Sequence, residues 1–141
     1  MNNLPDRPDL LLHLAERLRF AVFLQMQRHL AEHEVSATEC GVLTGLATCH
    51  LRPTVTALAA HCGIQQPTVT KVLHQTQARG WTLRHAVPTD HRLVRVSLTP
   101  AGQRLAAELQ RRSLEAEAIA LARLRESGDL ASLASVMGMA A

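Results

Sequence analysis

Cysteine side chains are among the reactive groups of this 141-residue chain, at Cys40, Cys49 and Cys62. No secretory leader is expected at the N-terminus, so we predict reduced thiols in a cytoplasmic protein. Cys40 lies about one turn into a predicted helix, where the partial positive charge of the N-terminal end lowers a thiol pKa. The neighbouring Glu39 acts in the opposite direction. Cys62 occupies an apolar position and Cys49 a helix end, where free cysteines usually serve as small packed side chains.

Two of the eight histidines have a spacing that suits metal binding. His29 and His33 stand four residues apart on a predicted helix, with Glu32 and Glu34 beside them. This spacing leaves open a metal-responsive protein. A bare H-x-x-x-H motif is nonetheless weak, and a solvated helix end explains it better. We therefore expect no bound metal and no cofactor.

Motifs of enzymatic catalysis are missing from the sequence. It contains no G-x-S-x-G nucleophile turn, no P-loop, no H-E-x-x-H and no C-x-x-C. Serine, histidine and aspartate occur, but without the local context that would activate a nucleophile. The sequence predicts a protein that is not an enzyme.

Positive charge is concentrated in the middle of the chain. Residues 52–100 hold six Lys and Arg residues and one acid, Asp90, so this segment is +5 while the whole chain is +3 and the remainder −2. Cations gathered on one face can neutralise phosphates and release their counterions, as polyanion-binding modules do. The alternative is a solvated basic surface without a partner.

The composition predicts one helical domain. Hydrophobic residues make up 47% of the chain, which is enough for a packed core. Leucine and alanine dominate, with 23 and 21 residues, while aromatic residues reach only 2%, and this favours helices over a β-sandwich or barrel. No apolar run is long enough to cross a membrane.

The first helix is predicted to begin near Asp9, after Pro5 and Pro8. One apolar stripe with spacings of three and four follows it at Leu11, Leu14, Leu18, Val22, Met26 and Leu30. A second apolar patch lies beside this stripe, at Phe20, Phe23 and Leu24. A helix with two apolar faces packs against more than one partner, and a subunit interface is a natural use of the second face.

A capping box opens the next predicted helix, because Ser36 is followed three residues later by Glu39. This short helix is expected to end near His50. It buries apolar residues at Val42, Leu43, Leu46 and Ala47.

The segment that follows has the pattern of a helix-turn-helix. Thr54 is the expected N-cap of its first helix. Ala59 lies where two helices approach closely, Gly63 where the turn needs a left-handed residue, and Pro67 in the first turn of the second helix. The apolar positions are Leu58, Cys62, Ile64, Val69 and Val72. This agreement favours a helix-turn-helix over an ordinary helical hairpin.

After Gly80 the apolar period changes from about 3.6 to 2, which indicates strands. Trp81, Leu83 and His85 alternate with Thr82 and Arg84, and Val94, Val96 and Leu98 alternate with Arg95 and Ser97. The connection between them, residues 86–92, is expected to be a longer loop. A basic β-hairpin directly after a helix-turn-helix predicts a winged helix.

Thr99 and Pro100 then open a long helix as N-cap and first residue, expected to reach about Arg125. Its predicted apolar positions are Leu105, Leu109, Leu114, Ala118, Leu121 and Leu124. Residues 127–129 break this helix. A short last helix follows with Leu130, Leu133, Ala134 and Met137.

The order of these elements and the wing sequence RHAVPTDHRLVRVSLTPAGQRL resemble the MarR family of winged-helix transcription regulators, over essentially the whole chain. The family's wing runs R-x-x-D-P-x-D-x-R, then an alternating strand and L-T-x-x-G-x-x-L. TVTKVL likewise resembles the start of its recognition helix. Two departures are Val87, where the family has its first wing Asp, and Gln66, where it often has a Ser cap. The matching wing residues are Arg84, Pro88, Asp90, Arg92, Val96, Leu98, Thr99, Gly102 and Leu105.

The resemblance implies a homodimer whose terminal helices interlock and whose two winged helices face one DNA duplex. Residues 1–50 and 101–141 would then form dimerisation and support helices, and residues 51–100 the DNA-binding region, in one intertwined domain. It also implies a small-molecule effector, bound between these regions in a pocket made by the first, second and fifth helices.

The expected DNA-binding residues are Gln65, Gln66, Thr68, Thr70, Lys71, His74, Arg84, Asp90, Arg92 and Arg95. Glutamine can pair with adenine, and lysine reaches guanine or phosphate. Arg92 is expected in a minor groove, while Arg84 and Arg95 would meet phosphates or solvent. Asp90 would orient an arginine through a charge-assisted hydrogen bond, or act as a plain turn residue.

The sequence thus predicts a cytoplasmic DNA-binding regulator, expected to be a ligand-responsive repressor on a pseudo-palindromic operator. One alternative is a protein-interaction module that kept the scaffold and lost operator binding. Others are a metal-responsive regulator, or a redox-responsive one, since some members of the resembled family sense oxidants through a thiol.

Overall fold

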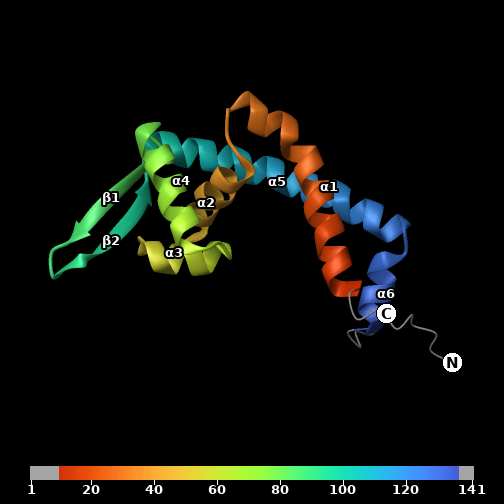
Figure 1. Ribbon diagram of the computed structural model, residues 1–141. Helices are drawn as coiled ribbons and strands as arrows, with labels where there is room; N and C mark the ends of the chain where they lie inside the picture. The colour runs from red at the N-terminus through yellow and green to blue at the C-terminus, as the bar shows by residue number, and fades with distance from the viewer. Residues whose placement is uncertain (1–9, 137–141) are drawn as a thin grey trace. The chain divides into compact units, whose positions relative to one another are not determined.

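The computed structural model describes residues 10–136 and consists of helices with one two-stranded antiparallel hairpin (Figure 1). This is the predicted fold class. Residues 29–111 form one compact unit, and the described residues before 29 and after 111 form another. No helix in the described range is both long and apolar enough to span a bilayer. The elements are α1 (Leu10–Glu32), α2 (Ala37–Thr48), α3 (Val55–Cys62), α4 (Gln66–Ala78), β1 (Thr82–Val87), β2 (Asp90–Leu98), α5 (Pro100–Glu126) and α6 (Asp129–Val136).

The two apolar faces of α1 have different environments. Along the predicted stripe, Leu14, Met26 and Leu30 are buried, whereas Leu11 is exposed. The second patch remains open, with Phe20 62% exposed and Leu24 46% exposed. Among the described residues, one apolar face of α1 therefore stays exposed.

The apolar stripe predicted for α5 is wrong at Leu114, Ala118 and Leu121, whereas Leu105, Leu109 and Leu124 are buried as predicted. The buried positions continue the helical period from Leu109 to Ala116, Ala120 and Leu124. Leu114, 67% exposed, and Leu121 lie on another face, and Ala118 is exposed as well. The large leucines suggested a stripe, but small alanines occupy the packed face. In the last helix, Met137 lies outside the described residues.

The capping box of α2 is confirmed. The Ser36 hydroxyl accepts from the Glu39 amide at 3.1 Å, and the Glu39 carboxylate accepts from the Ser36 amide at 3.4 Å. Val42, Leu43 and Leu46 are buried as expected, although Ala47 is exposed. The core of the unit of residues 29–111 forms between α2, α3, α4 and β2, around Val42, Leu46, Leu58, Ala59, Val69, Val72, Leu73 and Val96.

The helix-turn-helix forms as predicted, with one shift at a cap. Thr54 caps α3 by accepting from the Ala57 amide at 3.2 Å, and Gly63 ends it at φ 66° in the left-handed region. The N-cap of α4 is Gln65 rather than Gln66, and its side chain makes no capping bond. Pro67 stands in the first turn of α4, where its missing N–H is tolerated.

The hairpin is tighter than predicted. β1 extends to Val87 and β2 begins at Asp90, so only Pro88 and Thr89 connect the strands, in place of the longer loop of residues 86–92. The register shifts between Ala86 and Val87. The strands therefore extend into the segment whose proline and aspartate suggested a loop, although residues 90–93 are all exposed.

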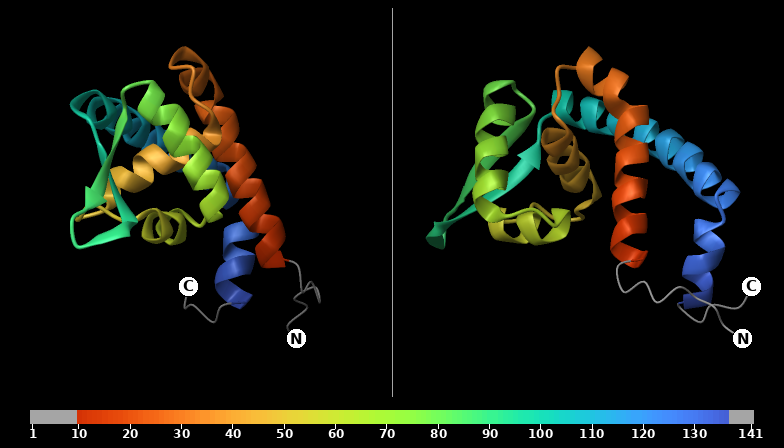
Figure 2. Two further views of the ribbon diagram at one scale, coloured as in Figure 1. Left: turned by 60° about the vertical axis from the view of Figure 1, so that its left-hand side comes forward. Right: turned by 45° about the vertical axis from the view of Figure 1, so that its right-hand side comes forward.

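The register decides which face of the hairpin packs inward. Thr82 pairs with Leu98 and Arg84 with Val96, and Thr82 and Val96 are fully buried. Leu83, on the opposite face, is 46% exposed. The buried Thr82 hydroxyl is satisfied by Thr76 of α4 at 2.9 Å. β1 packs on α4, and β2 packs on α2 and α3, as the further views show (Figure 2).

Candidate nucleic-acid interface

Helix α4 has one buried and one exposed face. Val69, Val72, Leu73 and Thr76 anchor it in the core. Five of the predicted DNA-contacting residues are exposed, namely Gln65, Gln66, Thr68, Lys71 and His74, and Thr70 is half-buried. The core contacts thus fix the orientation of α4, so that a row of amide, hydroxyl, ammonium and imidazole groups faces the solvent.

One side chain of this row and one backbone carbonyl of α4 already have partners within the unit of residues 29–111. The Gln66 side-chain oxygen accepts from the Thr56 hydroxyl at 3.3 Å. The Thr70 carbonyl accepts from a terminal guanidinium nitrogen of Arg84 at 3.5 Å. Both contacts tie α4 to its neighbours, α3 and β1.

At the wing tip, Asp90 organises the backbone. Its Oδ1 accepts from the Arg92 amide at 3.0 Å, the local bond of an aspartate turn. This is the turn role that the sequence left open beside an arginine-orienting role. The Arg92 side chain is exposed.

The structure separates Arg84 from Arg95, which the sequence treated alike. Arg95 is exposed on β2 and donates to the Arg52 carbonyl at 2.7 Å. Arg84 is half-buried on the inward face of β1, and its buried Nε has no hydrogen-bond partner within the part of the chain that the structure describes.

Arg79 contributes to the basic excess but has a structural role that sequence reasoning missed. Its guanidinium donates to the carbonyls of His33, at 3.1 Å, and Glu34, and approaches the Glu39 carboxylate at 3.5 Å. It also lies 3.9 Å from the centre of the Trp81 ring. All these partners are distant in sequence except Trp81, so no local pattern marks this residue.

The two local effects considered for Cys40, the helix end and Glu39, are joined by a third that the sequence does not show. Burial in α2 raises the pKa of Cys40, because desolvation disfavours the thiolate. Burial, and to a lesser degree Cys49, also raise the pKa of Cys62. The Cys62 thiol contacts the Gly41 carbonyl at 3.7 Å. At both residues, burial therefore disfavours the reactive thiolate form.

The two histidines have different contacts, one local and one with a residue far away in the chain. His29 Nδ1 lies 3.7 Å from a Glu32 carboxylate oxygen, and the His33 carbonyl accepts from Arg79. Within residues 10–136, no three His, Cys, Asp or Glu side chains gather as a metal site would require. On the wing, His85 bonds the Ser97 hydroxyl at 2.7 Å.

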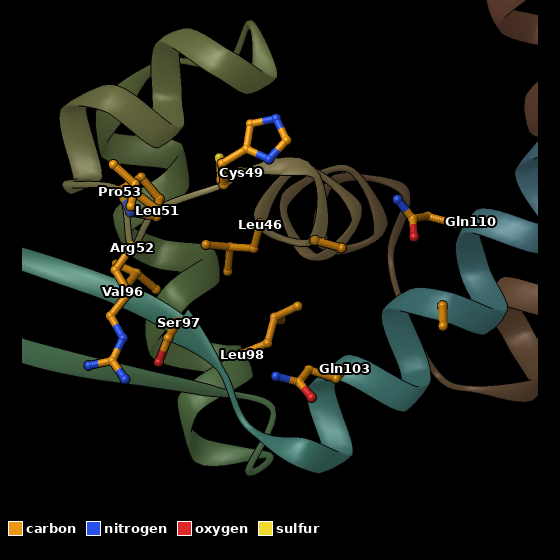
Figure 3. Close-up of a pocket in the computed structure, with 13 residues that line it drawn as sticks. Leu46, Cys49, Leu51, Arg52, Pro53, Val96, Ser97, Leu98, Gln103 and Gln110 are labelled. Atoms are coloured by element: carbon orange, nitrogen blue, oxygen red, sulfur yellow. The ribbon is translucent and has the colours of Figure 1, made fainter.

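An open cavity of about 450 Å³ lies between the end of α2, residues 49–53, β2 and the first turns of α5 (Figure 3). Leu46 and Leu98 give it apolar walls, and Ser97, Gln103 and Gln110 supply polar groups. Its lining comes from α2, the α2–α3 connection, β2 and α5, and includes no residue of α1.

Comparison with known proteins identifies the fold. No family model and no curated protein matches the sequence.

Among solved structures, apo MarR from E. coli has 19% identity and a TM-score of 0.70, over 89% of this chain and 93% of that one. The MepR–DNA complex of S. aureus has 17% identity and a TM-score of 0.74, over 89% and 93%. BpsR of Bordetella bronchiseptica, described with regulation of its DNA binding by 6-hydroxynicotinic acid, has 22% identity and a TM-score of 0.72, over 89% and 95%. The chain has the winged helix-turn-helix fold of MarR-type regulators, and the resemblance noted in its sequence is confirmed at the level of fold.

Proposed function

We propose that this chain is a transcription regulator that binds double-stranded DNA. The observation that carries this proposal is the exposed polar face of α4 beside a cationic hairpin, in a segment of six cations and one acid. A helix of this kind fits the major groove, and a wing reaches the adjacent minor groove. The structure of MepR with DNA supports this assignment, because its fold is the same.

In this proposal, Gln65, Gln66 and Lys71 approach base edges, and Thr68, Thr70 and His74 approach phosphates or thymine methyl groups. Arg92 enters the minor groove, and Arg95 lies near the backbone. Asp90 shapes the turn that presents Arg92. The unit of residues 29–111 contains all of these groups.

We further propose that the protein acts as a homodimer. Apolar side chains remain exposed on α1 and α5, a surface that a soluble monomer rarely leaves open. Residues 1–50 and 101–141 would supply this interface, and a two-fold dimer would require a pseudo-palindromic operator with half-sites one helical turn apart. The exposed residues are Leu11, Leu12, Phe20, Phe23, Leu24, Leu114, Ile119 and Leu121.

Regulation by a small molecule is the last part of the proposal. The cavity between α2, β2 and α5 has the size and the mixed lining of a ligand site. A ligand there would act as the effector of a repressor if it bound the DNA-free arrangement better than the DNA-bound one. The regulation of BpsR by 6-hydroxynicotinic acid is a precedent on this fold.

Fluorescence anisotropy tests DNA binding directly. The purified protein is titrated into the duplex upstream of its own gene and into a scrambled duplex, at two salt concentrations. We expect tighter binding to the first duplex, one dimer per site, and affinity that falls steeply with salt. Absence of binding to either duplex at low salt would support a protein-interaction module instead.

Replacing Arg92 by alanine tests the wing. We expect operator affinity to fall about tenfold, with the greatest loss for operators whose flanks are A·T-rich, because a narrow minor groove concentrates negative potential. Anisotropy with A·T-rich and G·C-rich flanks measures the difference. Arg123→Gln, in the last turn of α5, is the charge control. Equal losses in the two variants would contradict a minor-groove role.

A further inference from the structure

A second, smaller cleft opens between the helix-turn-helix and the wing. It has a volume of about 170 Å³ and is lined from α3, α4 and both strands of the hairpin. Its polar lining residues are Thr54, Thr56, Gln66, Thr70, Arg84 and Arg92. The lining includes two arginines and no acidic residue, so its charge favours an anion.

Arg84 brings one unsatisfied nitrogen to this cleft. Its Nε is buried and has no hydrogen-bond partner among residues 10–136, whereas a terminal nitrogen makes a long bond of 3.5 Å to the Thr70 carbonyl. A buried charged donor left unpaired is costly, and such groups usually have an absent partner. An oxyanion is the acceptor that a guanidinium fork fits best, through two parallel bonds.

Neighbouring side chains can complete the coordination of an oxyanion. Thr54 uses its hydroxyl oxygen to accept from Ala57, which leaves the hydroxyl hydrogen available for donation. Gln66 uses its side-chain oxygen to accept from Thr56, which leaves its NH₂ group available. Since a water takes up about 30 Å³, the cleft has room for a phosphate oxygen and bridging waters.

The position of the cleft selects one source of this anion. In the proposed DNA complex, α4 lies in a major groove and the wing in the adjacent minor groove. The sugar–phosphate strand that separates these two grooves must then pass between α4 and the hairpin. The cleft lies between the same two elements.

We propose that this cleft receives one phosphate of the DNA strand between the two grooves, with Arg84 as its main donor. The proposal rests on the DNA-binding function proposed above. Arg84 then fixes the position of the duplex between α4 and the wing and reads no base, because phosphate contacts carry no direct sequence information.

The test measures how DNA affinity depends on salt concentration. The DNA is a 24-base-pair duplex that lacks the operator sequence, so that only contacts with the sugar–phosphate backbone contribute to binding. Arg84→Gln is expected to weaken binding about tenfold and to reduce the slope of log K against log salt by about one for each protomer bound. The loss of affinity is expected to be the same on a second duplex with the same bases in scrambled order, because Arg84 reads no base. Arg84→Lys retains the charge without the fork and is expected to lose less. Arg123→Gln is the matched charge control, and thermal melting verifies the fold of each variant.

A second readout follows the Arg84 Nε–H resonance by nuclear magnetic resonance. It uses the wild-type protein, so it stays informative even if a variant fails to fold. It is expected to shift with the duplex and to stay unchanged with millimolar inorganic phosphate alone. A shift with inorganic phosphate but not with the duplex would assign the cleft to a small free anion and overturn the proposal.

The remaining outcomes separate this proposal from the one it rests on. If the wild-type protein fails to bind any duplex at low salt, both proposals are overturned. If it binds and Arg84→Gln behaves like Arg123→Gln, DNA binding stands and the phosphate cleft is overturned.

Discussion

Replacing Gly102 by alanine is expected to destabilise the protein by about 3 kcal/mol, because the new methyl group has no space. A Cβ at this position would lie 2.0 Å from the Trp81 carbonyl oxygen. This neighbour is backbone and cannot rotate away. The first turn of α5 would have to move away from the start of the wing, which would strain the bonds from the Thr99 amide to Trp81, at 3.0 Å, and from the Thr99 hydroxyl to Gly80, at 2.6 Å.

Thermal unfolding followed by circular dichroism measures this effect, and we expect the midpoint to fall by about 10 °C. Gly41→Ala is the matched control, since a Cβ there meets only the Ile64 Cδ1 at an ordinary 3.8 Å. Helix propensity should then stabilise the control by up to about 1 kcal/mol. Equal midpoints for the two variants would show that the close approach at Gly102 is absent in solution.

Replacing Arg79 by methionine is expected to destabilise the protein by about 2 kcal/mol. The change retains most of the aliphatic stem of the side chain. It removes the hydrogen bonds to the His33 and Glu34 carbonyls, just beyond α1. It also removes the cation that pairs with the buried Glu39 and lies over the Trp81 ring. Charged hydrogen bonds are individually worth about 1.5–3 kcal/mol. We expect less than their sum because the Arg79 side chain is 32% exposed and therefore partly screened.

Urea denaturation measures the free energy of unfolding of each variant. The fluorescence of Trp81, the only tryptophan in the sequence, reports whether the contact with Arg79 is lost. Arg111→Met is the control. Arg111 makes shorter bonds to Glu108, at 2.8 and 2.9 Å, but on an exposed helix surface, where such a pair is worth about 0.5 kcal/mol or less. A loss at Arg79 no greater than at Arg111 would contradict the anchoring role.

Much of the fold follows from short-range patterns. The capping box at Ser36, the caps at Thr54 and Thr99, and the left-handed Gly63 depend on residues within one turn of each other, so local chemistry sets them. The exposed polar row of α4 also followed from the sequence, because burial of Val69, Val72 and Leu73 leaves only one face outward.

The errors arose where burial depends on distant partners. Leu114 and Leu121 look like core residues, but small alanines pack on the inner face of α5. Likewise, the sequence shows that Cys40 lies near a helix end, but only the packed structure shows the burial that raises its pKa. The hairpin loop was predicted too long because Pro88 and Asp90 are compatible with both a loop and a tight turn.

By itself the sequence determined the order of elements, the N-caps of α2, α3 and α5 and the winged-helix class, because these depend on spacing along the chain. The tertiary structure decided the roles of the arginines. Arg79 holds the segment after α1, Arg95 donates to the Arg52 carbonyl, and Arg84 lines a cleft in which its Nε has no partner among the described residues. The charge of the three side chains is the same. Their roles differ because packing brings different groups to each guanidinium from residues far away in the chain.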